Sequence, residues 1–141
     1  MDTTFAAILQ ALGTGLPVLL GQFAVTLVLL VGGAAVYMRI TPFNERHLVA
    51  EGNVAAGITL AGTIVALSIP LAATLATNHA VVDIALWGVV ALILQLVAFA
   101  AAALLIPGLR GQIEAGNVAS GATLLGVQLA VALMNAAAMA G

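Results

Sequence analysis

Four long apolar segments, separated by short polar ones, dominate the pattern of hydrophobic and polar positions along the chain. A helix rises 1.5 Å per residue, so about 20 apolar residues are needed to cross the roughly 30 Å hydrocarbon core of a bilayer. Segments of this length run from Pro17 to Met38, from Asn53 to about Ala76, from Ile84 to Ile106, and from Asn117 to about Ala140. The pattern predicts an all-α membrane protein with four transmembrane helices.

A shorter apolar stretch precedes the first of these segments. Its large residues, Phe5, Ile8, Leu9 and Leu12, recur at helical spacing, and the glycines and proline of residues 13–17 are typical of a break. We therefore expect a short N-terminal interfacial helix before the first span. Residues 1–4 lack the basic start of a secretory signal, so we also expect the first apolar segment to be retained.

One stretch of sequence occurs twice. Residues Gly52 to Gly62 recur nearly unchanged as Gly116 to Gly126, at an offset of 64 residues. This predicts a single membrane domain over residues 1–141, built from two helical hairpins at residues 17–76 and 84–140. Because each hairpin holds two spans, both copies have the same orientation, and a pseudo-two-fold axis along the membrane normal is expected.

Composition narrows the possible functions. Hydrophobic residues make up 64% of the chain and charged residues 6%, with a mean hydropathy of +1.26, whereas soluble domains carry about 25% charged residues. Three Lys and Arg residues cannot neutralise a phosphate backbone, so no nucleic-acid partner is expected. Cysteine is absent and the two histidines lie far apart, so we expect no metal and no cofactor. Without a nucleophile–base pattern, we expect no catalytic residues and no enzyme.

The basic residues predict the orientation of the spans. Arg39 and Arg46 lie in the first connection and Arg110 in the third, whereas the second connection and both tails have none. The positive-inside rule places the first and third connections in the cytoplasm and both termini outside. Within the first connection, Thr41 and Pro42 are typical of an N-cap and first position, and predict a short helix there.

The duplicated Gly-Asn pairs have two interpretations. Asparagine is a preferred N-cap, so each pair could simply start a span. Alternatively, two helix N-termini with arginines nearby could form an anion or lipid-headgroup site. Its candidate residues are Gly52, Asn53, Gly116, Asn117, Arg46 and Arg110.

Helical geometry places two kinds of residue on opposite faces of the second and fourth spans. Small residues form one stripe on each span, which lets helices approach closely in lipid. We interpret this stripe as the contact between these two spans, although a contact between subunits would look the same. Its members are Ala55, Thr59, Gly62 and Ala66 on the second span, and Ala119, Thr123, Gly126 and Ala130 on the fourth.

The opposite face of the fourth span is polar. An amide side chain facing lipid without a partner costs several kcal/mol, so this face must meet protein or water. It provides either hydrogen bonds between helices or a polar pathway, within one bundle or between subunits. The face carries Asn117, Gly121, Gln128 and Asn135, and the available partners are Gln22, Thr26 and Gln95.

Several motifs resemble one family across nearly the whole chain. The most specific run is Thr41-Pro42-Phe43-Asn44-Glu45, followed by Leu48-Val49 and by Gly52-Asn53-Val54-Ala55-Ala56; Tyr37, Ile69-Pro70-Leu71, Asp83, Trp87-Gly88, Ala91, Gln95 and Asn135-Ala136-Ala137 add to it. The pattern resembles the YjfL-like proteins of domain-of-unknown-function family 350. The resemblance implies four spans in a bacterial plasma (inner) membrane and no established catalytic activity. Asn44 stands where an aspartate is expected, so no acidic role is carried over to that position.

Two hypotheses for the function follow. The first is a homo-oligomeric channel or facilitator for a small ion or polar solute, because four spans enclose little interior of their own. The alternative is a non-transporting membrane scaffold that recruits a cytoplasmic protein partner at Thr41 to Glu51, with a link to envelope stress that the resemblance suggests through gene neighbourhood. Both place the protein in contact with the lipid bilayer.

Overall fold

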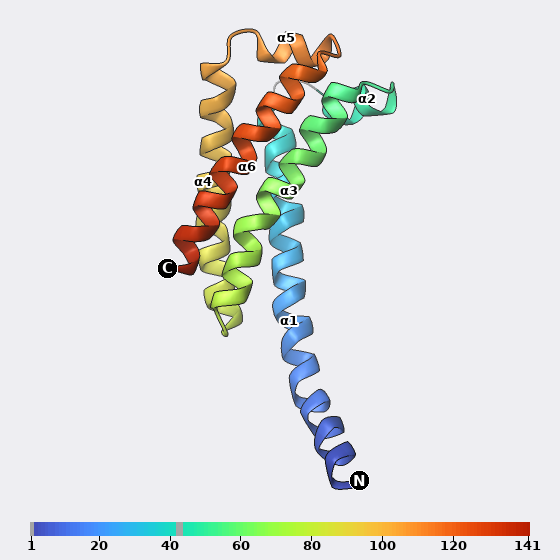
Figure 1. The fold of residues 1–141 in the computed structure, drawn as a ribbon, viewed down its shortest axis with the longest axis vertical. Coiled ribbons are helices and arrows are strands. Elements are labelled where there is room, and N and C mark those ends of the chain that lie inside the picture. Colours follow the sequence, from blue (N-terminus) through green and yellow to red (C-terminus); the bar gives the residue numbers. More distant parts are fainter. Residues whose placement is uncertain (1, 42–43) are drawn as a thin grey trace.

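The computed structural model describes residues 2–41 and 44–141, and all regular secondary structure in these residues is helical (Figure 1). The helices are α1 (Asp2–Ile40), α2 (Glu45–Ala50), α3 (Val54–Thr77), α4 (Val81–Leu105), α5 (Leu109–Glu114) and α6 (Val118–Ala140). The described residues contain no strand. Because α1, α3, α4 and α6 are each long and apolar enough to cross a bilayer, the predicted all-α membrane fold with four transmembrane helices is confirmed.

The short N-terminal interfacial helix is not a separate element, and this part of the prediction was wrong. Helix α1 runs without interruption through Gly13 and Pro17. A proline inside a helix removes only one backbone hydrogen bond, and apolar surroundings favour a backbone bonded within its own segment. Thr14 strengthens the same stretch, because its hydroxyl lies 3.1 Å from the Gln10 carbonyl and 3.2 Å from that of Ala11. The apolar stretch of residues 5–12 is therefore part of the same helix as the first span.

Helix α1 extends beyond the bundle that the other long helices form (Figure 1). The side-chain amide of Gln22 donates to the carbonyl of His79, in the turn between α3 and α4, at 2.6 Å. Residue 22 is thus level with one end of the bundle, and residues 4–20, which precede it, are exposed along their whole length. The two short helices, α2 and α5, lie at the opposite end.

Helix α2 begins three residues later than the sequence suggested. Its N-cap is Asn44, whose side chain accepts a hydrogen bond from the backbone N–H of His47 at 3.2 Å. The hydroxyl of Thr41 instead donates back to the Tyr37 carbonyl at 2.8 Å, which extends the bonding of α1. The predicted role of Pro42 as a first helical residue lies outside the described residues.

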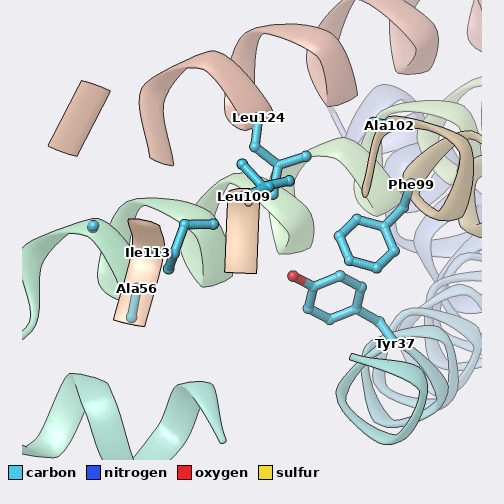
Figure 2. Packing of buried hydrophobic residues seen from close by; sticks show 8 residues of the cluster. Tyr37, Ala56, Phe99, Ala102, Leu109, Ile113 and Leu124 are labelled. Atoms are coloured by element: carbon cyan, nitrogen blue, oxygen red, sulfur yellow. The ribbon is translucent and has the colours of Figure 1, made fainter. Parts of the chain in front are cut away.

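The core is small, and its larger cluster of buried hydrophobic residues lies near α2 and α5. Tyr37 and Phe99 meet edge to face with ring centroids 4.6 Å apart, as Figure 2 shows. Leu109 and Ile113 of α5 complete this cluster from above the spans, together with Leu124 of α6. The short helices are therefore part of the packed core and hold their polar neighbours in fixed positions.

Candidate functional site

The two Gly-Asn pairs have nearly identical local structures. Gly52 and Gly116 have φ angles of 84° and 80°, which are favourable only for glycine. Asn53 and Asn117 follow with φ, ψ angles of −70°, 103° and −70°, 100°. The Asn53 side chain accepts from the N–H of Ala56 at 2.9 Å, and the Asn117 side chain accepts from the first turn of α6 in the same way. The interpretation of both asparagines as N-caps is confirmed.

The structure brings the two Gly-Asn pairs together but leaves the arginines apart from them. A hollow of about 430 Å³ lies between the pairs, and its rim carries the carboxylates of Glu51 and Glu114. Neither arginine lines it: Arg110 donates to Glu114 at 3.0 Å, and Arg46 lies with its Nε 3.1 Å from the sulfur of Met38. The candidate anion site therefore lacks a cationic side chain. In addition, the two carboxylates beside the helix starts would repel an anion.

Helices α3 and α6 form the most extensive contact in the molecule, through faces that are not equivalent. The small stripe of α3, namely Ala55, Thr59, Gly62 and Ala66, is buried. The equivalent stripe of α6, namely Ala119, Thr123, Gly126 and Ala130, is exposed. The predicted contact between two matching stripes is therefore wrong for a single chain, because α6 turns its polar face toward α3 instead.

Gly121 explains how the polar face of α6 approaches so closely. A methyl group added at Gly121 would lie 2.8 Å from the backbone oxygen of Ala55. The missing side chain lets the backbones of α3 and α6 come together at this point. Gly121 therefore packs two helices and does not line an open space.

Three amides of the bundle interior, Gln95, Gln128 and Asn135, are defined here as the amide row. Gln95 of α4 donates to the backbone carbonyl of Gln128 at 2.9 Å, and Asn135 of α6 donates to that of Ala91 at 3.0 Å. The oxygen of the Gln128 side chain lies 3.1 Å from the hydroxyl of Thr63 on α3. All three amides are at least nine-tenths buried. The row thus joins α3, α4 and α6 by hydrogen bonds inside one chain.

The other residues predicted for a polar pathway lie away from the amide row. Gln22 binds the α3–α4 turn, Thr26 donates to the Gln22 carbonyl at 2.9 Å, and Asn117 caps α6 on an exposed surface. Of the predicted pathway residues, only Gln95, Gln128 and Asn135 are brought into one interior.

A buried carboxylate that we did not single out from the sequence lies beside this interior. Glu45, the first residue of α2, is 2% exposed, and its Oε1 accepts a hydrogen bond from the hydroxyl of Tyr37 at 2.5 Å. The chain has one tyrosine, and Tyr37, Thr41 and Glu45 follow one another at intervals of four residues. Glu45 nevertheless belongs to α2 and not to α1, so this spacing was not a sufficient signal for the contact.

Burial changes the acidity of this carboxylate. Loss of hydration raises the pKa of Glu45 to about 7, and the hydrogen bond from Tyr37 opposes this rise only in part. The carboxyl group therefore exchanges its proton near neutral pH. Of the described carboxylates, it is the one buried inside the fold.

Two spaces flank the Tyr37–Glu45 pair. On one side an open groove of about 740 Å³, defined here as the α1–α2 groove, is lined by Arg39, Thr41, Glu45 and Arg46 together with Ala35, Met38 and Asn44. On the other side a closed cavity of about 10 Å³ is lined by Tyr37, Thr63, Gln95 and Gln128 with four apolar residues. The pair separates an accessible surface from the bundle interior.

The oxygens that lack a partner point to the chemistry of this interior. Among the described residues, the buried side-chain atoms without a hydrogen-bond partner are Glu45 Oε2, Gln95 Oε1 and Asn135 Oδ1. The amide orientation is fixed, because each amide nitrogen faces a carbonyl oxygen that can only accept. All three atoms are acceptors, so this interior can receive a hydrogen-bond donor and has no matching unpaired donor to offer.

These observations define an all-helical membrane protein whose four spans enclose a short row of polar side chains. The chain belongs to the family described as Domain of Unknown Function (DUF350), which matches residues 11–139. It is 36% identical over 104 residues to the UPF0719 inner membrane protein YjfL of Escherichia coli strain K12, across 74% of this chain and 79% of that protein. The protein of the same name from Escherichia coli O157:H7 matches equally. No solved structure matches the chain. The family resemblance seen in the motifs is confirmed.

Proposed function

We propose that this protein is a homo-oligomeric channel or facilitator for a small ion or polar solute in a bacterial inner membrane. The observation that carries the proposal is the amide row with its unpartnered oxygens, buried between helices that are otherwise almost wholly apolar. Burying a polar oxygen without a partner costs free energy, which a fold with apolar alternatives would avoid. The inner-membrane location is carried over from the relative that bears that name.

The exposed stripe of α6 supports the oligomer. Its counterpart on α3 packs tightly, whereas Ala119, Thr123, Gly126 and Ala130 face outward on a helix built for close approach. A second copy packed on this stripe would complete a contact that one chain leaves open. The cavity beside the amide row measures only about 10 Å³ in a single chain, which also favours a pathway that opens only in an assembly.

The orientation forms part of the proposal. Arg39, Arg46 and Arg110 all belong to the end of the bundle that carries α2 and α5, so the positive-inside rule favours a cytoplasmic location for that end and both termini outside. Single cysteines in Arg46→Cys and Arg110→Cys are expected to react with a membrane-impermeant reagent from the cytoplasmic side alone. Labelling of the two positions from opposite sides would contradict this topology.

Flux through liposomes tests the transport proposal. Purified protein is expected to pass at least one small ion or neutral solute, and Gln128→Leu combined with Asn135→Leu is expected to abolish that flux. Val65→Leu combined with Met134→Leu serves as the control, because both side chains are exposed. Absence of flux for every solute, or unchanged flux in the double amide variant, would overturn the proposal.

A scaffold role is the second candidate, and the α1–α2 groove favours it. The groove presents two arginines beside an open volume of about 740 Å³ at the proposed cytoplasmic end. Such a surface suits an acidic segment of a cytoplasmic partner at Thr41 to Glu51. A specific partner that is lost in Arg46→Ala, together with no flux, would favour this role. In neither role is the protein an enzyme.

A further inference from the structure

The unpartnered oxygens follow one another from the α1–α2 groove into the bundle. Glu45 lines the groove, and its partner Tyr37 also lines the closed cavity, where Gln95 faces the same space. Asn135 lies seven residues along α6 from Gln128, or about 10 Å further into the bundle. A hollow of about 360 Å³, lined by Thr77, Asn78 and the last residues of α6, lies at the far end.

The closed cavity has the size and polarity of a site for one water molecule. A cavity of about 10–15 Å³ holds a single water when two or more polar groups can bind it. This cavity measures about 10 Å³, and half of its lining residues, Tyr37, Thr63, Gln95 and Gln128, carry hydrogen-bonding side chains. Gln95, 3% exposed, supplies an acceptor without a partner, so a donor bound there would satisfy it.

We propose that the species handled by this interior is a proton, taken up from the α1–α2 groove at Glu45 and passed by Tyr37 to a water in the closed cavity. Uptake adds a proton to Glu45 Oε2 and converts the carboxylate into a neutral acid. For onward transfer the carboxyl group turns its new proton toward the Tyr37 oxygen, and the Tyr37 hydroxyl turns from Glu45 to the cavity water. Tyr37 then takes the proton of Glu45 as it gives its own to the water, which leaves a carboxylate, a neutral tyrosine and a hydronium ion. No electron is gained or lost. This inference rests on the transport function proposed above and names its substrate class.

The charged groups around Glu45 are consistent with proton exchange. Arg39 of α1 and Arg46 of α2 line the same groove, yet neither forms an ion pair with Glu45 among the described residues. His47 of α2 pairs with Glu51, and Arg110 of α5 pairs with Glu114. Helix α3 has no titratable residue, and α4 has only Asp83, at the other end of the bundle. Burial and Tyr37 therefore dominate the surroundings of the carboxyl group.

Liposomes that contain a pH-sensitive dye test the inference, with an imposed membrane potential driving proton movement. The wild type is expected to acidify the liposome interior, and Glu45→Gln, which keeps the shape of the side chain, is expected to slow this by about tenfold or more. Asp83→Asn removes an exposed carboxylate and is expected to match the wild type. Tyr37→Phe tests the second step and is expected to resemble Glu45→Gln.

A carboxyl titration separates the two proposals. The infrared band of a neutral carboxylic acid, measured in lipid, is expected to disappear near pH 7 in the wild type and to be missing at that pH in Glu45→Gln. Titration near pH 7 without flux of any kind supports the proton-binding site and overturns the transport function. Flux of another ion or a neutral solute that Glu45→Gln leaves unchanged overturns the proton inference and retains the transport function.

Discussion

The segments around the two Gly-Asn pairs, one in each sequence repeat, share a backbone conformation and differ in chemistry. Helices α2 and α5 have the same length and lie 64 residues apart, and each is followed by a glycine of positive φ and a capping asparagine. Yet the first residue of α2 is Glu45, and its equivalent in α5 is Leu109. Both side chains are buried, with 2% and 5% exposure. The duplicated scaffold therefore accepts either a carboxylate or an apolar side chain at this position.

The buried amide side chains lie in the second repeat, whereas the buried carboxylate lies in the first. Gln128 and Asn135 of the second repeat correspond to Ile64 and Leu71 of the first. The first repeat thus contributes the titratable group, and the second contributes all three amides of the amide row. The two sequence repeats therefore differ at the positions that form the polar interior, which agrees with the contact of α3 and α6 through non-equivalent faces.

The largest expected effect concerns the charge at Glu45. Its folded pKa, about 7, lies above the ordinary value of 4.5, so the folded state holds a proton that the unfolded state has released between these values. Stability should therefore fall as pH rises from 4.5 to about 7, by about 3 kcal/mol in total. Glu45→Gln should remove this pH dependence, because glutamine, like Leu109 at the equivalent position of the second repeat, carries no titratable group. Thermal unfolding in detergent across this pH range measures the dependence. An equal change of stability with pH in the wild type and in Glu45→Gln would contradict this prediction.

Two equivalent glycines provide the next comparison. A methyl group at Gly121 would meet the Ala55 backbone, whereas nothing lies within 4 Å of one at Gly57. Gly121→Ala should destabilise the protein by about 1–3 kcal/mol, because a backbone cannot move aside as a side chain can. Gly57→Ala should be neutral or stabilising by up to about 1 kcal/mol. Equal changes in the free energy of unfolding for the two variants, measured by chemical denaturation, would show that α3 and α6 do not pack as described.

The exposed stripe of α6 predicts an effect on association alone. Gly126 is exposed and nothing lies within 4 Å of a Cβ added there, so Gly126→Leu should leave folding of the single chain unchanged. If copies associate through this stripe, association in lipid should weaken by about 1–2 kcal/mol, the scale of single interhelical contacts. Photobleaching steps counted in bilayers measure the subunit number. Unchanged association would place the subunit contact elsewhere.

The smallest expected effect concerns the side chain of Gln128. Gln95 donates to the backbone carbonyl at this position, which a leucine retains, and only the contact with Thr63 is lost. Gln128→Leu should therefore cost about 0.6 kcal/mol, the average for an interhelical hydrogen bond in a membrane protein. A loss of several kcal/mol in the same unfolding assay would show that the amide row is needed mainly for stability.

Local patterns predicted most of the fold because they depend on near neighbours. The lengths of the apolar segments located four spans to within a few residues except at the start of α1, and the Gly-Asn pairs located two helix starts. The break at Gly13 to Pro17 was wrong, because an apolar environment keeps a proline-containing segment helical. Sequence spacing identifies the faces of a helix, but which face packs depends on every neighbouring helix.

The candidate site was predicted only in part for the same reason. Gln95, Gln128 and Asn135 were recognised because amides are rare in apolar spans. The arginines were assigned to the helix starts by spacing alone, whereas pairing within α5 and the position of α2 hold them elsewhere. The Tyr37–Glu45 contact joins two separate helices, α1 and α2, so helical periodicity could not establish it.

A structure of the protein in a lipid bilayer, at a resolution that reveals ordered water, tests the central claim most directly. The account predicts a water molecule within hydrogen-bonding distance of Gln95 Oε1 and the Tyr37 hydroxyl, with Glu45 enclosed behind it. A dry cavity, or amides of Gln95 and Asn135 turned toward lipid or toward other protein donors, would contradict it.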